Sequence, residues 1–187
     1  MARQLHILSV FPLPGKLASL RRSSGFTIIE LLITVSIAGT LMAIGLPSLQ
    51  NFLLTQKVRT ATSDIHVGLL LARSEAIKRN TDVELDRNTT SWTGGWNVEI
   101  KSSGSIIRTQ DAFNGLTITC NTNADAAAEA CPATVELSRT GRPTTFTEFR
   151  VFVNGNTSIA ARCLSLRLSG VPRITMDTDQ DSSDGCD

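Results

Sequence analysis

The most apolar stretch of the chain lies near its N-terminus. From Phe26 to about Leu46 the sequence FTIIELLITVSIAGTLMAIGL is almost wholly apolar. A helix of about 20 such residues is about 30 Å long, which is enough to cross the hydrocarbon core of a bilayer. The one charged residue in the stretch is Glu30. The pattern therefore predicts a transmembrane helix that contains a single carboxyl group.

After Pro47 polar residues become frequent, but the helical period continues. Apolar residues recur three or four positions apart, which is typical of one buried helix face: Val58, Ala61, Ile65, Leu69, Ala72 and Ala76. The opposite face carries charges: Lys57, Arg59, Asp64, Arg73 and Glu75. Asn80 is a candidate for the C-terminal end. The two halves together predict one helix of about 50 residues, kinked or locally melted at Pro47.

The rest of the chain has the period of β-strands. Short segments alternate apolar and polar residues and are separated by glycine-rich turns. The predicted strands cover 83–86, 96–101, 106–109, 116–120, 134–138, 148–153 and 163–168, and 121–133 is predicted to be a surface loop. The expected fold class is α+β, with the long N-terminal helix packed on an antiparallel sheet.

The first 25 residues are interpreted as a leader peptide. Pro12, Pro14 and Gly15 interrupt any helix, and the leader has four basic residues and no acid. No small-residue cleavage site follows the apolar run, so an ordinary secretory signal does not fit. Basic residues before the span place the leader in the cytoplasm and the domain outside. The expected division is 1–25 leader, 26–47 transmembrane helix, 48–80 amphipathic helix and 81–187 β-rich domain.

Charge and cysteine content limit the function classes. After residue 25 the chain has 14 basic and 17 acidic residues, which argues against general nucleic-acid binding. The spacing of the four cysteines matches no zinc site, so disulfides in an oxidising compartment are expected. Of the three possible connectivities we favour Cys120 with Cys131 and Cys163 with Cys186, because each pair closes a polar, loop-like segment.

The run RRSSGFTIIELL, residues 21–32, resembles the N-terminal signature of type IV pilins and type II secretion pseudopilins. The resemblance implies a pilin fold, cleavage after Gly25 by a prepilin peptidase, and N-methylation of Phe26. It also implies a helix-breaking role for Pro47. The processed protein would then span the bacterial inner membrane once, with a periplasmic C-terminal domain and other minor and major pilins or pseudopilins as partners.

Glu30 supports this interpretation on physical grounds. An ionisable group inside a hydrocarbon span is costly unless it meets a partner. We expect the partner to be the Phe26 amine of a neighbouring subunit, because pairing the two charges offsets the desolvation of both.

Three later segments resemble the FimT/FimU minor pilins and minor pseudopilin H (GspH) of type II secretion: LLARSEAIKRN at 70–80, WTGGWNV at 92–98 and RLSG at 167–170. The resemblance implies a minor subunit that primes or caps a type IV pilus. The alternative is minor pseudopilin H, which drives protein export.

A further alternative is a FimT-like DNA-binding tip pilin. DNA-binding FimT proteins carry Gly-Arg-x-Arg in a loop after the last strand, whereas this chain has Gly170-Val171-Pro172-Arg173. Arg173 is therefore the candidate DNA contact, with Arg167 and Arg162 nearby. Arg142 is interpreted as a turn residue. The acidic residues that follow Arg173 are expected to repel phosphate.

Other candidate chemistry is limited. Asp177, Asp179 and Asp181 have the spacing of a calcium loop, but Ser182 replaces the glycine and the closing glutamate is missing, so a solvated tail is preferred and no cofactor or metal is expected. Trp92 and Trp96 are expected in the core. His66 is the one histidine after the leader, no catalytic arrangement accompanies it, and the chain is not expected to be an enzyme.

Overall fold

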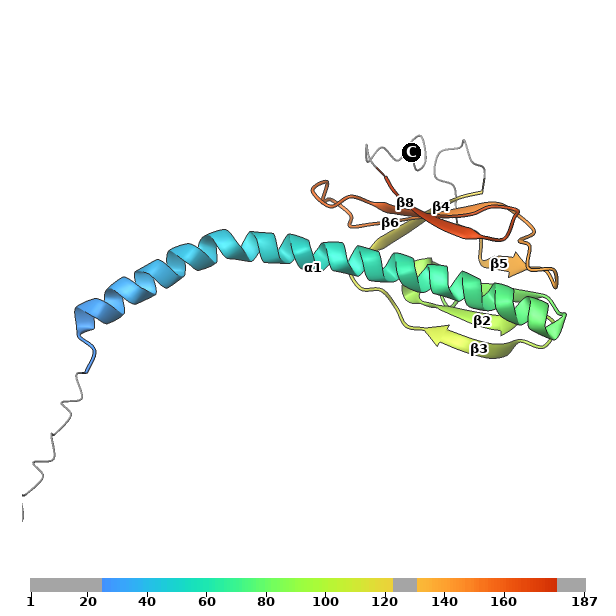
Figure 1. Cartoon of the computed structure of the whole chain (residues 1–187), viewed down its shortest axis with the longest axis horizontal. Helices are drawn as coiled ribbons and strands as arrows, with labels where there is room; N and C mark the ends of the chain where they lie inside the picture. The colour runs from blue at the N-terminus through green and yellow to red at the C-terminus, as the bar shows by residue number, and fades with distance from the viewer. Residues whose placement is uncertain (1–24, 123–130, 178–187) are drawn as a thin grey trace, which may run out of the picture. The chain divides into compact units, whose positions relative to one another are not determined.

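The first element is a single long helix, as the hydrophobic pattern predicts. The computed structural model describes residues 25–122 and 131–177 (Figure 1). Helix α1 (Ile28–Arg79) is continuous through Pro47. Proline removes one backbone N–H from the helix. The expectation of a locally melted segment at Pro47 is wrong, because the helical conformation continues through it.

Helix α1 ends at the predicted residue. Asn80 has a positive φ of 52°. Its N–H donates to the Ile77 carbonyl, and the Thr81 N–H donates to the Ala76 carbonyl. This is the Schellman arrangement, in which a left-handed residue after the helix satisfies its last carbonyls. Asparagine tolerates the left-handed conformation better than other non-glycine residues.

The chain divides into two compact units, residues 1–42 and 43–187. In the second unit one face of α1 is buried, and it contains every residue of the predicted stripe, with Thr62 and Gly68 in addition. Gly68 allows the Trp96 ring to lie directly on the helix, since a Cβ at Gly68 would stand 2.7 Å from Trp96 Cζ3. The prediction of an amphipathic continuation of the helix is confirmed.

The strands form two antiparallel sheets of four strands rather than one. Sheet A has the order β3-β2-β1-β5, and sheet B has the order β4-β6-β7-β8. The elements are β1 (Val83–Arg87), η1 (Trp92–Gly94), β2 (Trp96–Ile100), β3 (Ser105–Gln110), β4 (Thr117–Asn121), β5 (Thr134–Leu137), β6 (Thr147–Phe152), β7 (Arg162–Leu166) and β8 (Pro172–Met176).

All seven predicted strands are present, each within two residues of its expected ends. Strand β8 was not predicted, because Gly170 and Pro172, two residues apart, favour a loop. Pro172 is the first residue of β8, and β8 is the outer strand of sheet B. Proline is tolerated at both of these positions because its missing N–H interrupts no ladder there.

The two sheets and the helix share one core. The buried faces of β1, β2, β5, β6 and β7 meet the buried face of α1 in a single hydrophobic cluster. Trp92 and Phe149 pack edge to face, with ring centroids 5.0 Å apart. The Trp92 Nε1–H donates to the Pro132 carbonyl at 3.0 Å. The prediction that Trp92 and Trp96 belong to the core is confirmed, since both are fully buried.

Candidate functional site

The N-terminal end of α1 is closed by a capping box. Thr27 precedes the first helical residue, and its Oγ1 accepts a hydrogen bond from the Glu30 N–H at 3.2 Å. The Glu30 carboxylate accepts in return from the Thr27 backbone N–H at 2.9 Å and from Thr27 Oγ1 at 3.0 Å. These bonds satisfy donors that a helix start leaves free. Glu30 therefore has a structural role within its own subunit.

This cap is a feature that the sequence analysis missed. Thr-x-x-Glu before an apolar run is the usual capping-box pattern, and Thr27 to Glu30 has that spacing. Gly25 and Phe26 lie before the helix, and both are exposed. Among residues 25–122 and 131–177 nothing lies within 4 Å of a Cβ built on Gly25, so their packing does not require glycine there. The remainder of the predicted leader lies outside the described residues.

The helix that follows the cap is long and apolar enough to cross a membrane. The apolar side chains from Ile28 to Leu46 are all exposed. After Glu30 the next charged residue is Lys57. By length and composition α1 is thus a candidate membrane span that contains one carboxylate near its N-terminal end.

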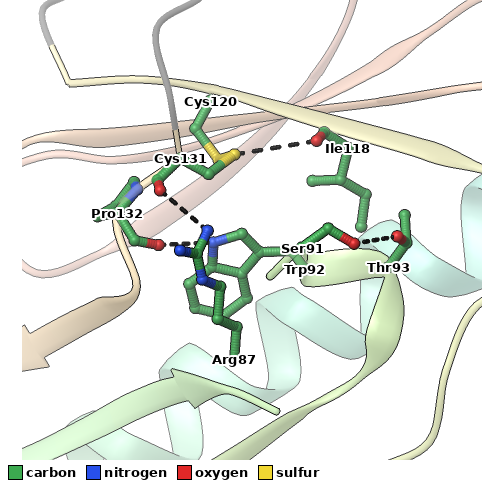
Figure 2. Close-up of a disulfide and its surroundings, with 8 residues drawn as sticks. All are labelled: Arg87, Ser91, Trp92, Thr93, Ile118, Cys120, Cys131 and Pro132. Carbon is green, nitrogen blue, oxygen red and sulfur yellow. Dashed lines mark hydrogen bonds between the residues drawn. A yellow bond between two sulfur atoms is a disulfide. The ribbon is translucent and has the colours of Figure 1, made fainter. Parts of the chain in front are cut away.

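A disulfide joins Cys120 and Cys131, one of the two pairs favoured from the sequence. Cys120 lies in β4 of sheet B, and Cys131 precedes β5 of sheet A, so the bond joins sheet B to the segment that enters sheet A. Figure 2 shows the disulfide and the side chains around it. Beside it, Arg87 donates to the Cys131 carbonyl at 3.2 Å. Cys163 is also disulfide-bonded. Its expected partner, Cys186, lies outside the described residues.

Of the three arginines considered for DNA binding, Arg162 lies apart from Arg173. Arg173 was expected in a loop, but it lies in β8 opposite Ser165. Arg162 is at the other end of the same strand pair, opposite Met176. Burial lowers the pKa of Arg162, and the nearby Arg59 lowers it further. Arg162 is therefore separated from Arg173 along the ladder.

Arg142 lies close to the turn before β8. A Cβ on Gly170, whose φ is 76°, would collide with the Gly141 carbonyl oxygen and stand 3.4 Å from the Arg142 Cα. Arg73 of α1 fixes this contact by donating to the Gly170 carbonyl at 3.0 Å. Three exposed arginines, 142, 167 and 173, therefore flank one turn. The positions of these arginines in the sequence could not show that Arg142 lies beside the Gly170 turn.

Asp177 is not part of a solvated tail. Its carboxylate is buried and accepts a bond from Arg150 Nε at 2.6 Å, and its N–H donates to the Ala161 carbonyl. This expectation was wrong because Asp177 directly follows β8, which the sequence analysis did not predict. Asp179 and Asp181 lie outside the described residues. Within 25–122 and 131–177, no three His, Cys, Asp or Glu side chains are grouped to hold a metal.

Two family models match separate segments of the chain. Residues 20–46 match the prokaryotic N-terminal methylation motif. Residues 61–170 match the family model of type II transport protein GspH. Comparison with curated protein sequences found no significant match.

Solved structures share the fold. Type IV minor pilin FimU of Pseudomonas aeruginosa is 22% identical, with a TM-score of 0.54, over 70% of this chain and 96% of that one. Minor pseudopilin EpsH from the type 2 secretion system of Vibrio cholerae is 14% identical, with a TM-score of 0.53, over 68% of this chain and 99% of that one. The model of GspH covers more than half of the sequence. The chain therefore belongs to the GspH family of type IV pilin-like proteins.

Proposed function

We propose that this chain is a minor subunit of a type IV pilus that primes or caps the filament. A prepilin peptidase removes residues 1–25 at the cytoplasmic side of the inner membrane and methylates Phe26. Residues 26–47 then anchor the subunit, and the domain lies in the periplasm. Other minor pilins and the major pilin are its assembly partners.

The observation that carries this proposal is the carboxylate of Glu30 in the candidate membrane span of α1, which has no other charged residue. Thr27 provides hydrogen-bond donors, but it leaves the negative charge of the carboxylate without an opposite charge. A charge in hydrocarbon costs about 3 kcal/mol or more, so a cationic partner is strongly favoured. The Phe26 amine of a neighbouring subunit provides that cation. Gly25 adds support, because it has no packing role within the subunit and a peptidase needs close access to the backbone.

The test separates the charge of Glu30 from its capping role. Glu30→Gln keeps an oxygen that can accept from Thr27 but removes the charge. Thr27→Val weakens the cap and keeps the charge. We expect Glu30→Gln to be inserted and processed normally, yet to be depleted from sheared filaments. Thr27→Val should be recovered at nearly the wild-type amount. If Thr27→Val is depleted from filaments and Glu30→Gln is recovered, Glu30 acts in assembly through its helix cap and not through charge pairing.

The machine in which the subunit acts is tested by deletion. The pilus is preferred because the late segment Gly170-Val171-Pro172-Arg173 and the C-terminal cysteines resemble FimT/FimU. A deletion strain should lose surface pili and keep the export of secreted enzymes. Loss of export with normal piliation would instead support minor pseudopilin H.

DNA binding is a second candidate function, favoured by the three arginines around Gly170. The net charge argues against it, because from Thr81 onward the chain has 9 basic and 14 acidic residues. We expect the detergent-solubilised full chain to bind duplex DNA weakly. Tight binding that falls steeply with salt and is lost in Arg173→Gln would make DNA uptake the main function.

A further inference from the structure

A groove of about 620 Å³ runs along α1 in the second unit. One side is formed by helix residues 53–64, and the other by residues 110–116, from the last residue of β3 onward. The apolar lining comes from Leu53, Ala61, Phe113 and Leu116. The helical side is about 16 Å long, or three turns. The groove can therefore receive one face of a helix that lies along α1.

Two charged side chains of the groove form no direct bond within the described part of the chain. Lys57 and Asp64 line it two helical turns apart, and neither forms an ion pair or hydrogen bond with any residue in the described part of the chain. Burial raises the pKa of Asp64, against the opposing effect of Arg108. A partly desolvated carboxylate favours an occupant that offers hydrogen-bond donors.

The apolar surface of α1 leads directly into this groove. Leu46, Leu49 and Leu53 are three or four residues apart, on the helix face that also carries Lys57 and Asp64. Leu49 is 53% exposed, Phe52 57% and Leu53 52%. These three side chains lie within about one and a half turns of α1, next to the groove, so together they form one exposed apolar surface. The exposed surface therefore requires a partner.

The length of the uncharged segment indicates which partner. No residue from Leu31 to Gln56 is charged, and this segment is about 39 Å long as a helix. The hydrocarbon core of a bilayer needs about 30 Å. About two helical turns thus remain outside the bilayer, and they contain leucine together with Asn51, Thr55 and Gln56. Such a segment offers both an apolar face for the groove and N–H or O–H donors for Asp64.

We propose that the groove receives the uncharged helical segment of an adjacent pilin-like subunit, one that extends beyond the bilayer as 51–56 does here. This inference rests on the proposed function, because it assumes assembly through the N-terminal helix. It adds a second contact, outside the bilayer, to the pairing at Glu30. A lipid acyl chain fits less well, since it has no donor for Asp64.

The first experiment maps the occupant in cells that assemble filaments. A photo-activated cross-linking residue replaces exposed Asn114 at the groove in the full-length chain, and Ser102 in the β2–β3 turn is the control position. We expect Asn114 to cross-link to the helix of a subunit that carries the N-terminal methylation motif, with no such product from Ser102. Cross-links from Asn114 to lipid, to DNA, to a β-domain or to nothing would overturn the inference.

The second experiment places a charge in the groove. Thr60 lines the groove and is exposed, so Thr60→Glu should fold. Ser63→Glu is the matched control, because Ser63 is exposed on the same helix outside the groove lining. A charged side chain placed in a helix contact should reduce filament incorporation about tenfold or more, which corresponds to about 1.4 kcal/mol. Ser63→Glu should change it less than twofold.

The outcomes separate this inference from the proposed function. If wild-type subunit is absent from sheared filaments, the proposed function itself fails. If wild type is present and Thr60→Glu is incorporated equally well, only the groove contact is refuted.

Discussion

Glu84 occupies an electrostatically unfavourable position in sheet A. It lies in β1, directly opposite Glu99 of β2 and Glu136 of β5. Burial raises the pKa of Glu84, Lys101 opposes this, and the carboxylates of Glu99, Asp86 and Glu136 raise the pKa further. Like charges directly opposite each other in a sheet are destabilising. Replacing Glu84 with glutamine should therefore stabilise the domain at neutral pH.

The size of the stability gain follows from the cross-strand pairs of Glu84 with Glu99 and Glu136. Each cross-strand pair contributes about 0.2–1 kcal/mol, and Lys101 offsets part of the repulsion, so we expect a gain of about 0.5–1 kcal/mol from Glu84→Gln. For a chain of this size that is about 1–4 °C in Tm. Folding raises the pKa of Glu84, so the protonated form of Glu84 favours the native state. The contribution of Glu84 to the free energy of unfolding is therefore lost as pH rises through its folded pKa. The advantage of glutamine should therefore vanish near pH 4.

The assay is thermal unfolding of the detergent-solubilised full chain between pH 4 and pH 8. Glu75→Gln is the matched control, because hydrogen bonding to Arg79 lowers the pKa of Glu75, with further support from Lys78. The control should lose stability at neutral pH and approach wild type in acid. If Glu84→Gln is destabilised at pH 7, or if its gain does not depend on pH, the electrostatic interpretation is wrong.

Three other predictions follow from single features. A bulky residue at Gly25 should accumulate as uncleaved precursor, and mass spectrometry that finds a normally trimmed, methylated Phe26 would overturn this assignment. Reducing or mutating the Cys120–Cys131 disulfide, which closes a short loop across 11 positions, should cost about 3 kcal/mol in unfolding free energy, as measured by denaturant titration; an unchanged midpoint would contradict it. Gly68→Leu should lower Tm by several degrees, because the new side chain would occupy the space of the Trp96 ring, whereas Gly39→Leu on the exposed part of α1 should not.

The helix and most strands were predictable because their evidence is local. The buried stripe from Val58 to Ala76 has the helical period, and the left-handed residue at its end is an asparagine. Strand β8 also has a local pattern, since Ile174 and Met176 alternate with Arg173 and Thr175, but Pro172 concealed it. The proline fits because its strand is at the edge of the sheet, which only the assembled topology shows.

The candidate sites depend more on contacts between distant segments. The cap at Thr27 is the exception, because its pattern is local: Glu30 follows Thr27 at the capping-box spacing. The approach of the Arg142 turn to Gly170 and the groove beside Phe113 could not be predicted. Both arise where segments far apart in the chain pack on α1, and neither leaves a periodic pattern in the sequence.

The buried stripe of α1 also has a mechanical consequence. It extends from Val58 to Ala76, about 27 Å along the helix axis, and it packs against both sheets. A pulling force applied along α1 acts parallel to this interface. The contacts of Val58, Ile65, Leu69 and the alanines must then yield together rather than one after another. The same core that stabilises the domain should therefore make it resistant to being pulled from its helix under tension.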